Sequence, residues 1–217
     1  MAASGKRYVS EQSRAVERRS RARRGEGERL RHELVAAASR LLAETGDLAT
    51  VSLRGVAREV GVAPTSVYLH FPDLESLVRA VRNQRFGDLI EAMEDAAEHA
   101  GADPVARVRA GAHAYVRFGL QNAGHYRVLF QSSLQPDGPA RASAYPGRST
   151  FERVAADVGA ALGPAAAADE AALLTTLLWT ALHVIVTLRT ALAWFPWPVV
   201  EHQVNDLVDR FIGRGVR

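Results

Sequence analysis

The chain has 217 residues, of which 47% are hydrophobic and 24% are charged, values close to the averages for globular proteins. Its length allows one or two domains. The absence of cysteine excludes a disulfide framework, a thiolate nucleophile and a Cys-ligated zinc or iron–sulfur site. The first 24 residues lack the apolar core of a secretory signal, so the sequence predicts a cytoplasmic protein.

The basic residues are concentrated at the N-terminus. Residues 1–24 hold eight lysines and arginines against two glutamates, whereas the whole chain has a net charge of only +3. Basic segments of this kind often bind nucleic acid, and the alternatives are a solvated tail or a patch that lies on a membrane surface. We interpret residues 1–27 as a basic, flexible arm.

Apolar residues in the first half recur at the three- and four-residue steps of a helix, and no segment shows the alternation of a strand. Ser52 is placed to cap the second of these helices, and Gly61 is placed to end it. Pro64 suits the first turn of the third helix, and Asp73 is placed to cap the fourth. The predicted helices cover residues 30–42, 52–60, 63–71 and 74–81.

The second half of the chain is also predicted to be helical. Asp103 and Pro104 form a helix start. Residues 132–147 contain three prolines and two glycines, which predicts a loop. The predicted helices cover residues 104–118, 125–131, 149–162, 167–193 and 198–213. The fold class is therefore all-α, with about nine helices.

One predicted helix is apolar enough to raise the question of a membrane span. Ala171–Leu188 contains no charged residue, and its length is at the lower limit for a span. However, the segment contains several threonines and the ionisable His183, and Asp169, Glu170 and Arg189 lie close to its ends. We interpret it as a buried core helix or a subunit interface, with no membrane partner.

Residues 53–70, with the sequence LRGVAREVGVAPTSVYLH, fit a helix-turn-helix. Ala57 provides the small residue where two helices cross, and Gly61 provides a residue that tolerates the left-handed backbone of the turn. The second helix would then present its N-terminal half to a DNA major groove. The alternative is a tight helical corner with no role in DNA binding.

The segment from about residue 29 to 81 resembles the DNA-binding domain of the tetracycline-repressor (TetR) family. The similarity lies in the stretches LVAAASRLLAETG, TVSLRGVAREVGV and SVYLHFPDLESLV. Tyr68, His70 and Phe71 stand where the family has its tyrosine–x–histidine–phenylalanine signature. In the second half, GHYRVLF at 124–130 and the Trp179–x–x–x–His183 step resemble one variety of the family's ligand domain.

The resemblance implies a domain organisation and a set of partners. Residues 28–73 would form a three-helix, helix-turn-helix DNA-binding domain, and residues 74–217 a helical effector-binding and dimerisation domain. The expected partners are a double-stranded DNA operator, a small-molecule effector and a second copy of the chain, bound through the last two helices. Leu74 and Pro64 depart from the family, which usually has lysines there, so the arginines of the arm would compensate.

We assign candidate site residues from these patterns and the resemblance. Phosphate and base contacts are expected from the arm, from the start of the helix at 52–60 and from the recognition helix. An apolar pocket with a few polar groups would bind the effector, although core packing is the alternative role for each of its residues. The DNA-binding candidates are Arg18, Arg19, Arg21, Arg23, Arg24, Ser52, Arg54, Arg58, Pro64, Thr65, Ser66, Tyr68 and His70. The ligand-binding candidates are Tyr115, Phe118, Tyr126, Phe130, Trp179 and His183.

The sequence thus predicts a DNA-binding transcriptional regulator, a repressor that a small-molecule effector releases from a palindromic operator. The alternative is a helical small-molecule sensor that acts through a protein partner and retains vestigial DNA binding. No motif of an enzyme is found, so we expect no catalysis, no metal site and no cofactor. The apolar loop at 194–198 (WFPWP) covers either the pocket or the dimer seam.

Overall fold

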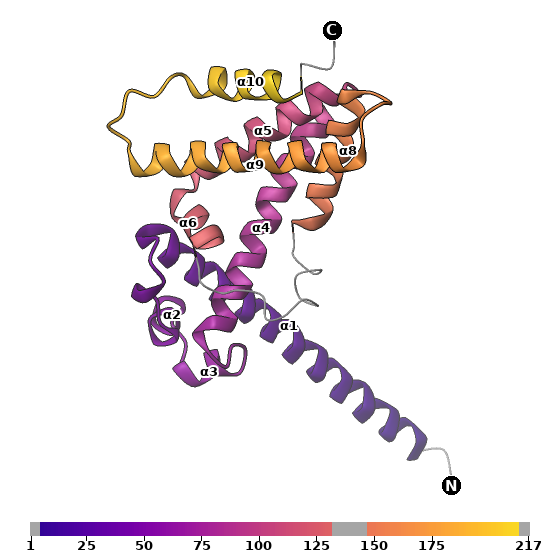
Figure 1. Cartoon of the computed structure of the whole chain (residues 1–217). Helices are drawn as coiled ribbons and strands as arrows, with labels where there is room; N and C mark the ends of the chain where they lie inside the picture. Colours follow the sequence, from indigo (N-terminus) through magenta and orange to yellow (C-terminus); the bar gives the residue numbers. More distant parts are fainter. Residues whose placement is uncertain (1–4, 132–146, 213–217) are drawn as a thin grey trace. The chain divides into compact units, whose positions relative to one another are not determined.

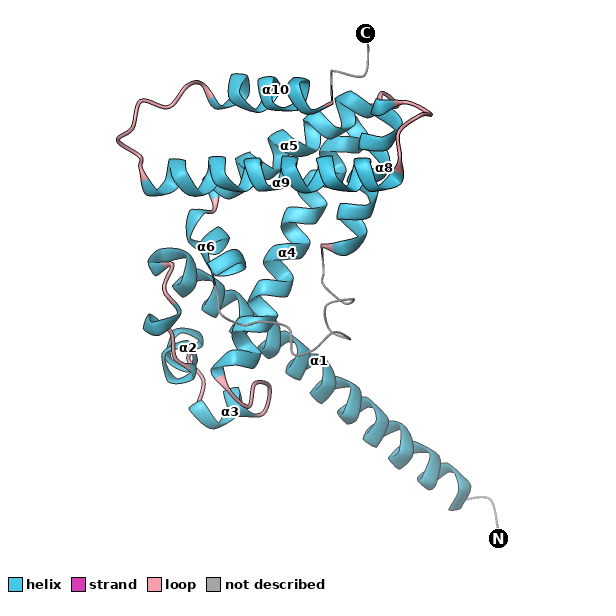
Figure 2. Ribbon diagram, viewed as in Figure 1, coloured by secondary structure: helices cyan, strands magenta, loops and turns pink. Residues whose placement is uncertain are grey.

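The computed structural model of the chain describes residues 5–131 and 147–212, and the side chains among them except those of residues 5–24 and 131. These two ranges contain helices and no strand (Figures 1 and 2), which confirms the all-α prediction. The helices are α1 (Gly5–Thr45), the 3-10 helix η1 (Leu48–Thr50), α2 (Leu53–Val60), α3 (Pro64–Tyr68), α4 (Leu74–His99), α5 (Pro104–Gln121), α6 (Ala123–Gln131), α8 (Arg148–Leu162), α9 (Ala168–Ala191) and α10 (Val200–Phe211).

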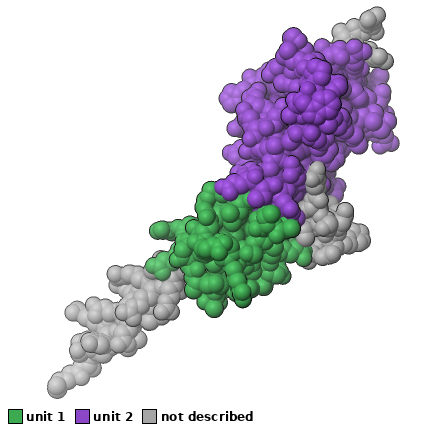
Figure 3. All heavy atoms as spheres, turned by 90° about the vertical axis from the view of Figure 1, so that its left-hand side faces the viewer, with its two compact units in different colours: residues 1–41, 49–81 green, residues 42–48, 82–217 purple. Residues whose placement is uncertain are grey.

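The chain divides into two compact units (Figure 3). The first unit comprises residues 1–41 and 49–81, and the second comprises residues 42–48 and 82–217. Two helices are shared between the units. The last turn of α1 belongs to the second unit, and the first eight residues of α4 belong to the first.

Helix α1 begins earlier than the sequence pattern suggests. It starts at Gly5, so most of the segment for which we expected a flexible arm is helical. The reason is local, because residues 6–24 contain neither glycine nor proline and include seven arginines, which favour helices. The helix ends at Thr45, where Gly46 takes a φ of 61°.

The first unit is built around the corner between α2 and α3. The Ser52 hydroxyl accepts a hydrogen bond from the Gly55 N–H at 3.0 Å, which confirms the predicted N-cap. Gly61 ends α2 in the left-handed conformation, with a φ of 78°. Helix α3 is shorter than predicted and ends at Tyr68. The chain continues in a turn in which the N–H groups of His70 and Phe71 both donate to the carbonyl oxygen of Val67. Phe71 itself is buried.

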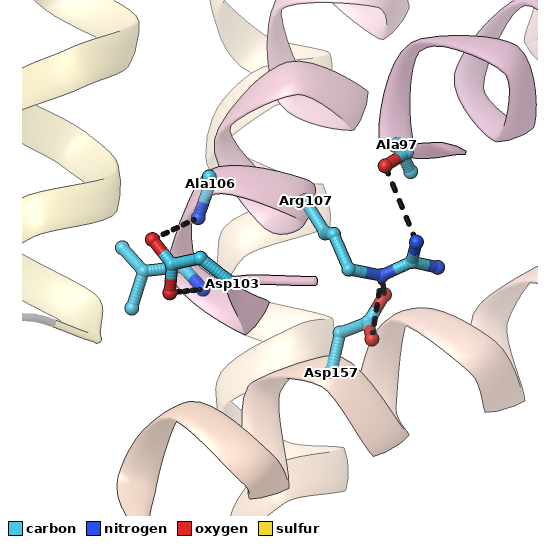
Figure 4. Close-up of polar contacts among 6 residues, drawn as sticks. Ala97, Asp103, Ala106, Arg107 and Asp157 are labelled. Atoms are coloured by element: carbon cyan, nitrogen blue, oxygen red, sulfur yellow. Dashed lines mark hydrogen bonds and ion pairs between the residues drawn. The ribbon is translucent and has the colours of Figure 1, made fainter. Parts of the chain in front are cut away.

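The second unit packs its helices around α5, which contacts α6, α8, α9 and α10. Asp103 caps α5 as predicted, because its carboxylate accepts hydrogen bonds from the N–H groups of residues 105 and 106 (Figure 4). Gly119 permits a close approach of α5 and α9, since a Cβ there would lie 2.6 Å from Val186 Cγ1. Helix α4 continues far beyond the predicted residue 81, because apolar residues keep their helical spacing up to Met93.

Helix α9 has two apolar faces. One is buried in the core of the second unit and includes Leu178, Leu182 and Val186. The other is exposed and includes Leu177, 44% exposed, and Val184, 43% exposed. Among the described helices, α9 is the one long and apolar enough to cross a membrane, a criterion that core helices of globular proteins also satisfy. The exposed face therefore lacks a partner within the described chain.

Candidate DNA-binding head and effector cavity

Helix α3 presents polar side chains outward from the first unit. Val67 is fully buried and fixes the helix on the core, whereas Pro64 and Thr65 are exposed and Ser66 is partly exposed. Tyr68 is 50% exposed. A combination of anchoring and exposed positions is what a recognition helix requires, because the exposed side chains must reach base edges or phosphates.

Helix α2 places two cations beside this helix. Arg54 and Arg58 are both exposed and lie one turn apart on α2, and α2 contacts α3. The neighbouring Glu59 forms an ion pair with Arg40, with 3.2 Å between Glu59 Oε1 and Arg40 Nη2. The first turn of α2 also carries the positive end of the helix dipole, so this surface favours phosphate.

The remaining DNA-binding candidates differ in position. His70 is partly buried, and its Cε1 atom lies 3.7 Å from the position that a Cβ of Gly27 would take. The imidazole thus packs beside α1. The five arginines of the arm lie on the backbone of α1, but their side chains are outside the described residues: Arg18, Arg19, Arg21, Arg23 and Arg24.

The second unit contains a cavity of about 430 Å³ between α4, α5, α6, α8 and α9. Of the ligand-binding candidates, Tyr115, Phe130 and Trp179 line this cavity. The other three lie behind its wall: Phe118 packs on the core, while Tyr126 and His183 contact the lining residue Tyr115 through hydrogen bonds. The size and the largely apolar wall fit a small-molecule site.

A hydrogen-bonded network connects the aromatic candidates. The Trp179 Nε1–H donates to the Tyr115 hydroxyl at 3.1 Å, and the two tyrosine hydroxyls lie 2.7 Å apart. The Tyr126 hydroxyl lies 2.6 Å from His183 Nδ1. Burial lowers the pKa of His183 and raises the pKa of Tyr126. A neutral His183 that accepts a hydrogen bond from Tyr126 at Nδ1 satisfies all of these contacts.

Sequence reasoning missed two parts of the cavity. The first is the wall contributed by α4, which includes Phe86, Leu89 and Met93. Their helical spacing was the available signal. The second is a pair of charged contacts at the rim. Arg107 Nε lies 3.1 Å from both carboxylate oxygens of Asp157, and its Nη1 donates to a backbone carbonyl of α4 (Figure 4).

The pH dependence of stability is expected to depend on His183. Because its pKa is lowered in the folded state, the unfolded chain binds more protons once the pH falls below about 6.5, and folding stability decreases there. His183→Asn keeps an acceptor but cannot titrate, so its melting temperature should fall less between about pH 7 and about pH 5. The matched control is His202→Asn on the exposed surface of α10. Equal slopes for His183→Asn and wild type would contradict the expectation.

These features define a class of protein: a regulator with a helix-turn-helix head and a helical domain that encloses a small-molecule cavity. Two family models match the chain. Residues 34–81 match the bacterial regulatory proteins of the tetR family, and residues 108–214 match the tetracyclin repressor-like C-terminal domain. The chain belongs to the TetR family, whose members are DNA-binding transcriptional regulators, which confirms the prediction made from the sequence.

Solved structures share this fold. A protein of unknown function from Rhodococcus sp. RHA1 is 27% identical, with a TM-score of 0.72 over 85% of this chain and 94% of that one. A TetR family transcription regulator from Marinobacter aquaeolei VT8 is 18% identical, with a TM-score of 0.64 over 88% and 98%. The fatty acid degradation regulator FadR from Bacillus halodurans is 14% identical, with a TM-score of 0.65 over 86% and 96%.

Proposed function

We propose that this chain is a homodimeric repressor that binds a palindromic operator in the cytoplasm and leaves it when a small molecule fills the cavity of the second unit. The observation that carries the proposal is the exposed polar surface of α3, held on a buried Val67 and flanked by Arg54 and Arg58 of α2. Two such surfaces related by a two-fold axis would read major grooves about 34–36 Å apart.

Helix α4 supports a route from effector to DNA. Its residues 82–99 belong to the second unit and carry Phe86, Leu89 and Met93 into the cavity wall. Its residues 74–81 belong to the first unit, whose core includes Leu77 and Val78. An effector that binds better to the position of α4 that DNA disfavours lowers the affinity for DNA, with a coupling energy of typically about 1–3 kcal/mol.

The exposed face of α9 supports the dimer. Four apolar side chains follow one stripe of the helix, at steps that keep them on the same side: Leu173, Leu177, Val184 and Leu188. The loop after α9 adds Trp194, 79% exposed, while no residue of 194–198 is among those lining the cavity. An apolar surface of this extent is expected to be buried against a second copy.

Introducing charge into this stripe is expected to separate the dimer. Leu177→Glu together with Val184→Glu should convert a dimer into a monomer, because the carboxylates would be desolvated at the interface. Analytical ultracentrifugation measures the change. Ala160→Glu, on an exposed position of α8, is the control and should leave the mass unchanged. A double variant that keeps the wild-type mass would place the interface elsewhere.

Selection of bound duplexes from a random DNA pool tests the function itself. Wild type should recover a palindrome, and Thr65→Ala with Ser66→Ala should lose the preference for it while keeping weak binding through phosphates. Weak binding without sequence preference by the wild-type chain would contradict the proposal. It would favour the alternative, a sensor that acts through a protein partner. Leu74 and Pro64 support that alternative, because they stand where lysines are expected from the resemblance to the TetR family.

A further inference from the structure

We propose that the effector cavity takes an uncharged ligand with an elongated, mainly apolar body and one neutral polar group, and that it selects against carboxylates of the same length. The inference rests on the proposed function, because it specifies the chemical class of the effector. It is drawn from the shape of the cavity and from the pairing of the charges around it.

The cavity is extended along α4. Its lining begins at Phe86 and ends at Glu98, a separation of about 18 Å along a helix at 1.5 Å per residue. The end near Phe86 is apolar and aromatic, with the rings of Phe86 and Phe130 5.5 Å apart. Towards the opposite end α4 contributes Glu94 and Glu98 to the lining, and Arg107 donates there to the carbonyl oxygen of Ala97. A ligand with a long apolar body matches the first end, and its polar group matches the second.

The charges at the polar end compensate one another within the protein. Arg107 binds both oxygens of Asp157 at 3.1 Å and the carbonyl oxygen of Ala97 at 3.2 Å. Glu94 accepts a hydrogen bond from the Thr150 hydroxyl at 3.0 Å and forms an ion pair with Arg153. A ligand carboxylate would have to displace one of these acids and leave it partly buried without its cation, which is costly.

The third arginine of the lining is paired as well. Arg148 Nε lies 2.8 Å from Glu152 Oε1, one turn further along α8. The described lining therefore holds three arginines and three acids, the third acid being Glu98. Each of these arginines is paired with an acid, Arg148 with one outside the lining, so a ligand carboxylate competes with a protein carboxylate at every one of them. A neutral hydroxyl or carbonyl can hydrogen-bond at the rim without breaking an ion pair.

The aromatic end is also arranged for a neutral ligand. The Trp179 Nε1–H donates to Tyr115, and the Tyr126 hydroxyl lies within hydrogen-bond distance of His183. The Thr175 hydroxyl donates to the carbonyl oxygen of residue 171 at 2.7 Å. Because these donors are engaged within the protein, the wall at this end offers mainly ring faces and methyl groups to the ligand. Burial also lowers the pKa of His183, which disfavours its cationic form.

The experiment compares two probes of equal chain length, 1-decanol and decanoate, by isothermal titration of the full chain without DNA at a pH where decanoate is ionised. We expect 1-decanol to bind at least about tenfold more tightly, because decanoate must disrupt a paired arginine. Quenching of Trp179 fluorescence, with Trp194→Phe and Trp197→Phe to remove the other indoles, locates the probe in the cavity.

A charge-unpairing variant tests the reason for this selectivity. Asp157→Asn removes the charge opposite Arg107, and we expect it to raise the affinity for decanoate by at least about tenfold with little change for 1-decanol. The control is Asp206→Asn, whose carboxylate pairs with Arg210 at 2.6 Å on α10 and does not line the cavity. It should leave both affinities unchanged.

Three results would overturn the inference: binding of decanoate as tight as that of 1-decanol by the wild-type chain, binding of neither probe, or an unchanged ratio in a folded Asp157→Asn variant. The comparison on the wild-type chain remains valid even if the variant does not fold. Because no DNA is present, these results are independent of the duplex selection. A chain that selects a palindrome but prefers decanoate would retain the proposed function and lose only the ligand class.

Discussion

Replacing the five arginines of the arm with glutamine is expected to weaken binding to the selected duplex by about a hundredfold at moderate salt and to flatten its salt dependence. The slope of log K against log salt should fall by about 0.9 for each phosphate that the arm no longer neutralises. The expectation follows from the distribution of charge. The first 24 residues hold eight basic residues, whereas Leu74 and Pro64 stand where the resemblance to the TetR family leads one to expect lysines.

Fluorescence anisotropy over a range of salt concentrations measures this slope. Glutamine preserves the helix-forming tendency of α1, so a change in affinity reports on charge rather than on folding. The control replaces Arg117 and Arg210, which are exposed on the second unit, and should leave the slope within error of wild type. An unchanged slope in the five-fold variant would show that the arm does not contact phosphate.

Substituting Gly124 is expected to cause the largest loss of folding stability among single changes of a glycine to alanine. A Cβ at this position would lie 2.2 Å from the carbonyl oxygen of Ala43 and 2.8 Å from its carbonyl carbon. The obstacle is backbone rather than a side chain that can rotate, so α6 and the last turn of α1 must move apart. We expect Gly124→Ala to lower the free energy of unfolding by about 1–3 kcal/mol.

The matched control is Gly87→Ala in the middle of α4. A Cβ there has no atom within 4 Å, and alanine favours the helix over glycine by about 0.8–1.0 kcal/mol. The same substitution should therefore stabilise the protein at residue 87 and destabilise it at residue 124, as measured by urea denaturation. A neutral or stabilising Gly124→Ala would show that α6 adjusts without loss of packing.

The fold is predictable from the sequence largely because its helix ends are encoded locally. Ser52, Gly61 and Asp103 cap or terminate helices through contacts within a few residues of the chain. The length of α3 is harder to predict from the sequence, because it depends on the burial of Phe71, which directly precedes a proline. The charge pattern does not indicate that residues 5–27 lie on helix α1, because an arginine-rich segment is charged whether or not it is helical.

The cavity is harder to predict because it is assembled from distant segments. Arg107 and Asp157 are 50 residues apart, and no local pattern joins them. Tyr115 and Trp179 are predicted to face a common interior, and the structure brings their side chains within 3.1 Å. The same reasoning selects Tyr126 and His183, which lie behind the wall instead, because aromatic composition does not distinguish a lining side chain from the one that supports it.

The assignment of residues 42–48 to the second unit limits how the domains of this protein can be exchanged with those of its relatives. The chain passes from one unit to the other at three points, after residues 41, 48 and 81. Cutting the chain after Val81 would take Leu42, which is fully buried, away from the unit that includes it. A chimaera that combines this head with the sensor of another regulator therefore has to transplant the matching α6 as well, because Gly124 leaves room for the backbone of Ala43. In this respect the DNA-binding part and the effector-binding part cannot be exchanged independently of each other.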